Sequence, residues 1–171
     1  MHGIAFMEKE IKILVIDDDP FLQRLVEASL IKESFTMVFA SSGEEGLEKA
    51  LEIVPDLILL DVIMPGIDGF EVCRQIRNSK TLQHIPVIIL TALDDRDSKI
   101  QGLEAGADDY IGKPFDKIEF KARVKTIIRL SRISKIEKLT ELEAIIMEKD
   151  RIIEEQKKQI AQLLSHANQS A

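Results

Sequence analysis

The sequence predicts an α/β protein built on a doubly wound, five-stranded parallel sheet with five helices. Short apolar runs alternate with segments of helical periodicity five times within about 125 residues. The runs are unbroken or nearly so, which is typical of parallel strands buried on both faces. Polar residues follow most of them directly, at the edge of the sheet where ligands bind in this fold class.

Five apolar runs are expected to form the strands. The first and third end in carboxylates, the fourth in a threonine, and the fifth in a glycine and a lysine. The second is short and rich in residues that favour strands. The strands are predicted at residues 11–16, 36–40, 57–60, 87–90 and 109–111.

Helices are expected after each strand, and several carry recognisable capping residues at their starts. An N-cap side chain accepts a hydrogen bond from a backbone N–H that has no partner within the helix. The expected caps are Asp19 before Pro20, Ser42 with Glu45, and Asp116 with Glu119. The helices are predicted at 21–31, 43–53, 69–77, 98–105, and from about 116 onward.

Composition is typical of a globular domain with some chain to spare. The 171 residues are 45% hydrophobic and 31% charged, and no apolar run approaches the roughly 18 residues that cross a bilayer. Residues 1–130 hold 16 Lys or Arg against 23 Asp or Glu, whereas residues 131–171 hold seven of each. Neither part has the basic excess typical of nucleic-acid binding, so we expect contact with neither nucleic acid nor membrane.

The chain is expected to be cytoplasmic. Its single cysteine, Cys73, leaves no intramolecular disulfide and fits a reducing compartment. The first residues lack the basic region and apolar core of a secretion signal. The predicted divisions are an N-terminal segment (1–9), one domain (10–130), a coiled-coil helix (131–165) and a disordered C-terminus (166–171).

The carboxyl ends of the predicted strands bring together polar residues that are far apart in the sequence. Asp17 and Asp18 follow the first strand, Asp61 the third, Thr91 the fourth and Lys113 the fifth. Closely packed carboxylates stay ionised only when a positive charge joins them, and Mg²⁺ prefers such oxygen ligands. The lysine and threonine would then neutralise and orient a phosphoryl group on Asp61.

Each residue also has a simpler structural interpretation when taken alone. Acidic residues after a strand often cap the next helix, as expected for Asp19. Lys113 alone would be a solvated loop lysine, Thr91 a helix cap, and Tyr110 a half-buried aromatic. Their combination at matching strand ends favours a phosphoryl site.

Four motifs occur at these strand ends in a specific order. They read Ile-Leu-Val-Ile-Asp-Asp-Asp-Pro over 13–20, Leu-Leu-Asp-Val-Ile-Met-Pro-Gly-Ile-Asp-Gly over 59–69, Ile-Leu-Thr-Ala over 89–92, and Gly-Ala-Asp-Asp-Tyr-Ile-Gly-Lys-Pro-Phe over 106–115. Together they resemble the receiver domain of a two-component response regulator over about residues 10–130. The resemblance implies a flavodoxin-like fold with strand order 2-1-3-4-5.

The resemblance also implies the chemistry of the site. Asp61 would accept a phosphoryl group from the phosphohistidine of a sensor histidine kinase or phosphotransfer protein. Asp17, Asp18 and Asp61, with the backbone carbonyl of Ile63, would hold the Mg²⁺ cofactor. The domain would assist its own phosphorylation and dephosphorylation, but it would not be an enzyme in the usual sense.

Further residues carry implied roles around the phosphoryl group. Lys113 would pair with it, and Thr91 with Ala92 would bind it and move on phosphorylation. Tyr110 would be the aromatic switch coupled to that movement. The family also implies a cis peptide bond before Pro114, which proline makes accessible.

Two apolar positions predict a long-lived phosphoryl group. In the family, the side chains two places after the acceptor and two after the switch threonine flank the attacking water. Here they are Ile63 and Leu93. Neither can orient a water for in-line attack, so we expect slow loss of phosphate.

Two alternatives remain open at this point. A phosphatase of the haloacid dehalogenase type would use Asp17 as nucleophile within an Asp-x-Asp motif, but that family expects Gly-Thr or similar next, and Pro20 follows here. A receiver that only dimerises, without phosphorylation, is the second alternative. The intact set of strand-end residues argues against it.

The C-terminal stretch predicts one long helix, because residues 133–164 contain no Gly or Pro. Unbroken from Asp116 to Leu164, it would span about 49 residues and roughly 73 Å. Apolar residues recur there with heptad spacing. The a positions are Leu139, Ile146, Ile153 and Ile160, and the d positions are Leu142, Lys149, Gln156 and Leu163.

This pattern favours a parallel two-stranded coiled coil and hence a homodimer. Lys149 and Gln156 interrupt the seam, Ile145 and Ile152 widen it toward a higher oligomer, and the phase is poor over residues 130–138. A single exposed helix stabilised by charge pairs is the alternative. The chain is therefore interpreted as a phosphorylation switch that signals through this coil to an output domain or a partner.

Overall fold

The computed structural model describes residues 10–93 and 96–169, with side chains up to residue 163. The predicted segment 1–9 and the last two residues lie outside this part. The chain divides into two compact units, Met1–Ser131 and Arg132–Ala171.

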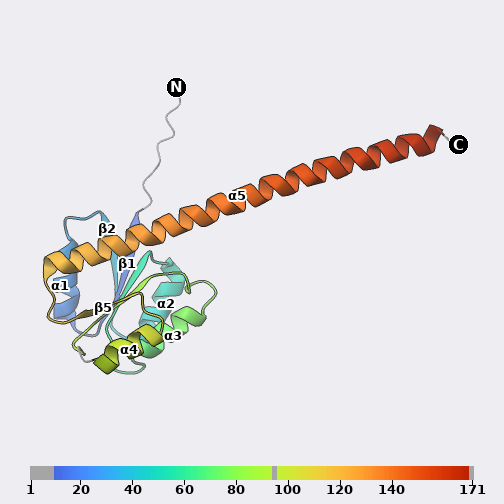
Figure 1. The fold of residues 1–171 in the computed structure, drawn as a ribbon. Helices are drawn as coiled ribbons and strands as arrows, with labels where there is room; N and C mark the ends of the chain where they lie inside the picture. The colour runs from blue at the N-terminus through green and yellow to red at the C-terminus, as the bar shows by residue number, and fades with distance from the viewer. Residues whose placement is uncertain (1–9, 94–95, 170–171) are drawn as a thin grey trace. The chain divides into compact units, whose positions relative to one another are not determined.

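The first unit contains the predicted five-stranded sheet, and all of its strands are parallel. The strand order is β2-β1-β3-β4-β5, which confirms the expected order (Figure 1). The strands are β1 (Ile11–Ile16), β2 (Phe35–Ala40), β3 (Leu57–Leu60), β4 (Val87–Thr91) and β5 (Asp109–Gly112).

Five helices follow the strands in alternation, as predicted. The expected N-caps are present: Asp19 accepts from the Phe21 N–H, Ser42 from Glu45, and Asp116 from Ile118 and Glu119. The helices are α1 (Pro20–Leu30), α2 (Gly43–Ile53), α3 (Gly69–Asn78), α4 (Arg96–Glu104) and α5 (Lys117–Gln169).

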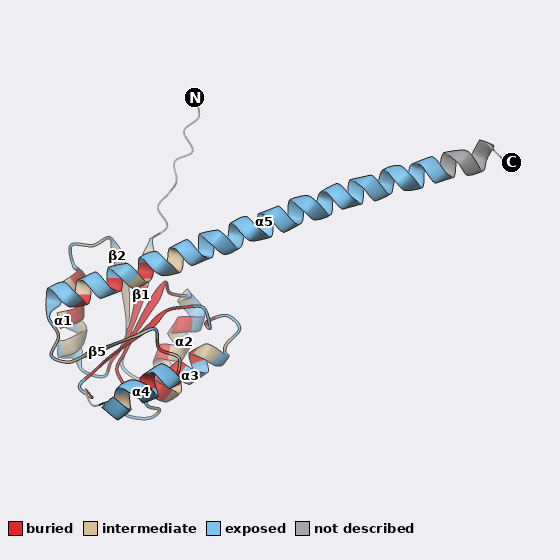
Figure 2. Cartoon of the chain, in the orientation of Figure 1, coloured by how far each residue is buried: buried red, intermediate tan, exposed pale blue. Residues whose placement is uncertain are grey.

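Two hydrophobic cores, one on each face, bury the sheet (Figure 2). Val72 and Ile76 of α3 belong to the core that also contains residues of α2. Phe120 and Val124 of α5 belong to the other core, with residues of α1. β3 is buried at all four positions, because alternate side chains of a central parallel strand enter opposite cores. This burial fixes the strand ends that carry the candidate site.

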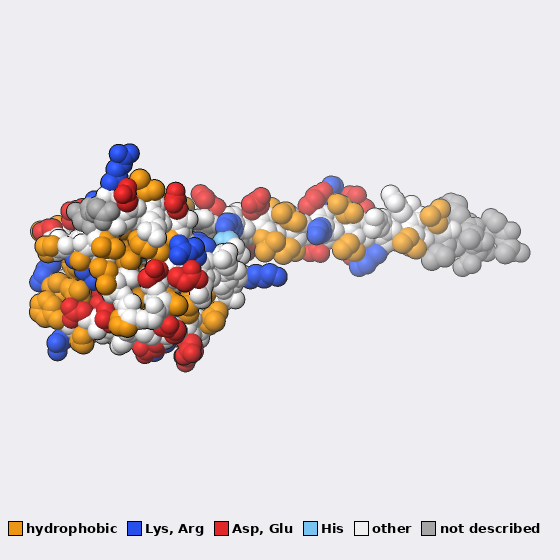
Figure 3. All heavy atoms as spheres, turned by 90° about the horizontal axis from the view of Figure 1, so that it is seen from below, with side chains coloured by type: hydrophobic (Ala, Val, Ile, Leu, Met, Phe, Trp, Pro, Cys, Tyr) orange, Lys and Arg blue, Asp and Glu red, His pale blue; other side chains and the backbone are white. Residues whose placement is uncertain are grey.

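The second unit is helical throughout its described residues, as part of α5. Its apolar side chains are exposed along the helix among charged ones (Figure 3). The helix runs to Gln169, past the end expected at residue 165, since no Gly or Pro stops it. Within the described residues, no helix is long and apolar enough to span a bilayer.

Candidate functional site

The acidic pair lies at the carboxyl end of β1, where backbone hydrogen bonds fix its first member. The Asp17 N–H donates to the Ala40 carbonyl at 3.0 Å, and the Asp17 Oδ1 atom accepts from the Asp19 N–H at 2.9 Å. Asp17 is buried, whereas Asp18 is exposed. The chain turns here because Asp19 and Pro20 start α1.

Asp61 lies directly after β3 and is buried. Its N–H donates to the Ile16 carbonyl at 2.9 Å, which extends the β1–β3 ladder by one residue. Its Oδ1 atom accepts from the Val62 N–H at 2.8 Å. A Cβ atom on Gly69 would lie 2.1 Å from the Asp61 carbonyl oxygen, so only glycine allows the next helix to start this close to the strand end.

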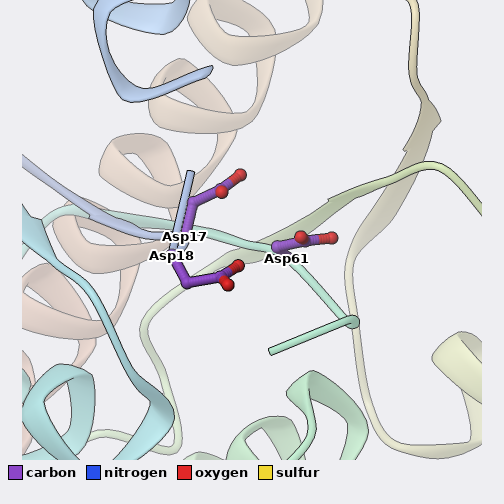
Figure 4. A group of neighbouring side chains, drawn as sticks. All are labelled: Asp17, Asp18 and Asp61. Carbon is purple, nitrogen blue, oxygen red and sulfur yellow. The ribbon is translucent and has the colours of Figure 1, made fainter. Parts of the chain in front are cut away.

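The structure brings the three predicted carboxylates together (Figure 4). One oxygen from each of Asp17, Asp18 and Asp61 lies within 4.8 Å of the others. Lys113 completes the cluster, with its Nζ atom 2.7 Å from Asp17 Oδ2 and 3.4 Å from Asp61 Oδ2. An all-oxygen donor set with one exposed member fits Mg²⁺, which takes few protein ligands and keeps several waters.

The electrostatics of the cluster are those of a site prepared for a cation. Burial raises the pKa of the Asp17 carboxyl above its usual value, while the hydrogen bonds from Lys113 and from the Asp19 N–H oppose that shift. Of the three clustered carboxylates, Asp17 and Asp61 pair with the Lys113 ammonium group. A divalent cation would therefore relieve repulsion that Lys113 alone leaves in place.

The remaining predicted residues lie at the ends of β4 and β5. Thr91 is fully buried, and its Oγ1 accepts from the Leu93 N–H at 3.5 Å. The Tyr110 hydroxyl donates to the Leu93 carbonyl, so the predicted switch tyrosine contacts the loop that follows Thr91. The predicted cis peptide bond between Lys113 and Pro114 is present.

The two apolar positions expected to flank the phosphoryl site differ in exposure. Ile63 is 55% exposed, and Leu93 is partly buried and packs against one of the cores. Ala92 is exposed. The Ile63 side chain is therefore largely exposed to solvent, two residues after Asp61.

Sequence reasoning missed Gln23. Its Nε2 atom donates to the Asp17 carbonyl at 2.7 Å and to the Ala40 carbonyl at 3.3 Å. A lone glutamine on an amphipathic helix resembles any solvated residue. No sequence pattern predicts that its amide reaches two strand ends, so these contacts are found only in the structure.

Comparisons with known proteins agree with this geometry. The family model of the response regulator receiver domain matches residues 13–125. Response regulator PleD of Caulobacter vibrioides is 45% identical over 133 residues, covering 78% of this chain and 29% of PleD. The alkaline phosphatase synthesis transcriptional regulatory protein PhoP of Bacillus subtilis is 47% identical over 123 residues, covering 72% of this chain and 50% of PhoP.

Among solved structures, the beryllofluoride-activated DrrB receiver domain is similar with a TM-score of 0.64 and 36% identity. It covers 70% of this chain and 98% of the DrrB chain. The present chain thus matches a whole receiver domain, but at most half the length of the two curated relatives. The chain belongs to the response regulator receiver domain family.

Proposed function

We propose that the first unit is a phosphoacceptor receiver of a cytoplasmic two-component system and that Asp61 accepts the phosphoryl group. The donor would be a phosphohistidine on a sensor histidine kinase or a phosphotransfer protein. The P–N bond of the donor breaks as an Asp61 oxygen bonds to phosphorus. The observation that carries this proposal is the meeting of Asp61 with Asp17, Asp18 and Lys113 at one edge of the sheet.

The residues around Asp61 divide the work of positioning and charge neutralisation. Asp17, Asp18, Asp61 and the Ile63 carbonyl would hold Mg²⁺, which when bound supplies positive charge to the phosphoryl oxygens. Lys113 is already 3.4 Å from Asp61 and supplies a second positive charge. Both effects act in a mostly buried site, where they are worth more than in water.

The residues at the end of β4 would change their contacts when Asp61 is phosphorylated. The Thr91 hydroxyl and the Ala92 N–H would bind the phosphoryl oxygens, and the Leu93 backbone already connects Thr91 to the Tyr110 hydroxyl. A movement of Thr91 toward the phosphoryl group would change the contact of Tyr110. This supports a switch role for Tyr110.

The proposal is tested by phosphorylating the full chain with acetyl phosphate and Mg²⁺ and locating the modification by mass spectrometry. We expect one phosphoryl group, on Asp61. It should be absent from Asp61→Asn and present in Asp97→Asn, a control that changes an acid in the first turn of α4. A phosphoryl group on Asp17 would instead support the phosphatase alternative, and no modification at all would refute the proposal.

For the second unit, we propose a parallel coiled-coil homodimer. An apolar stripe this long is costly to expose to water, and its a and d positions from Leu139 to Leu163 follow the predicted heptads. Ion pairs within one helix, such as Arg151 with Glu148 and Glu155, lie among these residues. These ion pairs stabilise a single helix only weakly. Burial of the apolar seam between two helices would therefore contribute more free energy than the ion pairs do.

We further propose that phosphorylation changes how the two helices pair. α5 is one continuous helix from the first unit into the second, and residues 130–138 fit the heptads poorly. A coupling free energy between Asp61 and the seam would make the dimer dissociation constant depend on beryllofluoride. We expect this dependence to vanish when Ile133 and Ile136 become serine, while beryllofluoride binding is unchanged; if the dependence persists, the segment is passive.

A further inference from the structure

The side chain of Gln23 has a hydrogen-bonding role that its place on α1 does not require. Its backbone N–H serves the helix by donating to the Asp19 carbonyl at 3.1 Å. Its side-chain amide instead reaches the ends of two strands, donating to the carbonyls of Asp17 and Ala40. Ala40 also accepts the N–H of Asp17. One side-chain amide thus joins the carboxyl ends of β1 and β2 through two hydrogen bonds.

The peptide group that Gln23 holds is the one joining Asp17 to Asp18. Asp17 is fixed in several ways, through its N–H, its carbonyl and both carboxylate oxygens. Asp18 is exposed, and within the described residues its carboxylate has no hydrogen-bond or ion-pair partner. The direction of the Asp18 side chain therefore depends on its backbone, one end of which is the carbonyl that accepts from Gln23.

We infer that Gln23 is a positioning residue for the cation site, acting through the Asp17–Asp18 peptide. This inference rests on the proposed binding of Mg²⁺ by the carboxylate cluster. Metal ligands must be held close to their productive geometry, and the groups that hold them are part of the site. Hydrogen bonds to its carboxylate orient the Asp17 side chain. The hydrogen bond from Gln23 to the Asp17–Asp18 peptide orients Asp18 through its backbone.

Two substitutions separate positioning from charge. Gln23→Met keeps the length of the side chain and removes the donor. Gln23→Glu keeps the shape, removes the donor and adds a negative charge near the cluster. If long-range attraction dominated, Gln23→Glu would bind Mg²⁺ more tightly than the wild type. If positioning dominates, both variants bind it more weakly.

The experiment is a Mg²⁺ titration of the full chain by calorimetry, with amide hydrogen exchange measured before metal is added. We expect the dissociation constant to rise about tenfold in both variants, with faster exchange at Asp17 but not at the central strand β3. The control is Gln75→Met, because within the described residues the Gln75 amide donates only to Glu71, on the outside of α3. It should match the wild type.

The outcomes are distinguishable. Tighter binding by Gln23→Glu, or unchanged binding by both variants, overturns the role of Gln23 and leaves the phosphoacceptor proposal standing. Exchange that rises equally in every strand shows a loss of global stability, and it overturns the inference as well. A wild-type chain that binds no Mg²⁺ overturns the proposed cation site itself.

Discussion

The Lys113 ammonium nitrogen lies 3.4 Å from the Oδ2 atom of Asp61, although the two residues come from different strand ends. The same nitrogen lies 2.7 Å from Asp17. All three side chains are almost fully buried. Lys113 is therefore the fixed positive charge that the two buried carboxylates share.

Replacing Lys113 with methionine should destabilise the metal-free chain by about 3 kcal/mol, because a buried charge cluster then loses its counter-charge. Mg²⁺ at millimolar concentration should restore much of that loss, since a cation bound only to the folded state stabilises it. Urea unfolding with and without Mg²⁺ measures both effects. Lys80→Met, at an exposed position, is the control. A loss that Mg²⁺ fails to reduce would contradict the idea that both cations neutralise the same carboxylates.

Much of the fold could be predicted because local signals agree with one another. The unbroken apolar run before Asp61 predicted a strand buried on both faces, and β3 is buried at every position. Asp19, Ser42 and Asp116 predicted helix starts, and each accepts the expected backbone hydrogen bonds. The carboxyl ends of parallel strands lie at one edge of a sheet, and the order implied by the resemblance makes β1 and β3 neighbours, which brings Asp17 and Asp61 together there.

The residues that could not be predicted act through side chains on unrelated elements. Gln23 reaches a carbonyl of β2 from α1, and Arg77 reaches the turn before β5 from α3. Such contacts depend on how each helix is rotated against the sheet and on how far a side chain reaches. No repeating pattern of apolar and polar residues predicts which backbone carbonyl a polar side chain will contact. The seam of α5 differs again, because the proposed partner of its exposed apolar residues is a second copy of the chain.

Arg77 is predicted to be the main polar link that holds the chain around β4 and β5. Its guanidinium donates to the carbonyls of Gly106 at 2.7 Å and Ile85 at 2.8 Å, and it pairs with Asp108 at 2.7 Å. Asp108 also accepts the N–H of Val87. Arg77→Met should lower the free energy of unfolding by about 2–3 kcal/mol, as expected for hydrogen bonds to a charged group.

The control for this prediction lies on the same helix. Arg74 pairs with Glu71 at an exposed position, so Arg74→Met should cost less than about 0.5 kcal/mol. Urea unfolding compares the two variants directly. Equal losses would mean that the Arg77 network contributes no more than an ordinary surface pair.

Glu33 is predicted to make the free energy of unfolding depend on pH in the acid range. Its carboxylate lies 2.5 Å from Lys121 and 3.1 Å from Lys125, at the start of α5. Hydrogen bonds from these lysines lower the pKa of Glu33 below its usual value. A carboxyl whose pKa is lower in the folded state stabilises the fold above its unfolded pKa, and this contribution is lost as the pH falls through the folded pKa.

Glu33→Gln should therefore be less stable than the wild type at pH 7, and the difference should shrink as the pH falls through the lowered pKa of Glu33 in the folded state. Urea unfolding across this range measures it. Glu27→Gln on α1 serves as the control, since Glu27 is exposed. A gap between wild type and Glu33→Gln that stays constant with pH would show that the lysine pairs do not act through the charge of Glu33.

The apolar side chains of Ile63 and Leu93 predict a phosphoryl group that persists for many minutes. Neither side chain can hydrogen-bond an attacking water, and an unpositioned water loses the entropic advantage of a bound one. Ile63→Gln, at the more exposed position, should shorten the lifetime about tenfold. The release of phosphate from the purified, phosphorylated chain measures the rate. A wild-type lifetime of seconds would refute this prediction.

The predicted dimer depends on the a and d positions of the second unit. Ile153 occupies an a position and Met147 a b position, on the outside of the same seam; in the single chain they are 46% and 73% exposed. Ile153→Glu would place two carboxylates face to face in the seam and should weaken the dimer by about 3 kcal/mol, or roughly a hundredfold. Met147→Glu should leave the dissociation constant nearly unchanged, because its side chain stays in water.

Lys149→Leu should strengthen association by replacing a polar d residue, and it should also admit higher oligomers. Sedimentation equilibrium measures all three, and a wild-type chain that remains monomeric at high micromolar concentration would instead favour a single exposed helix held by its own charge pairs.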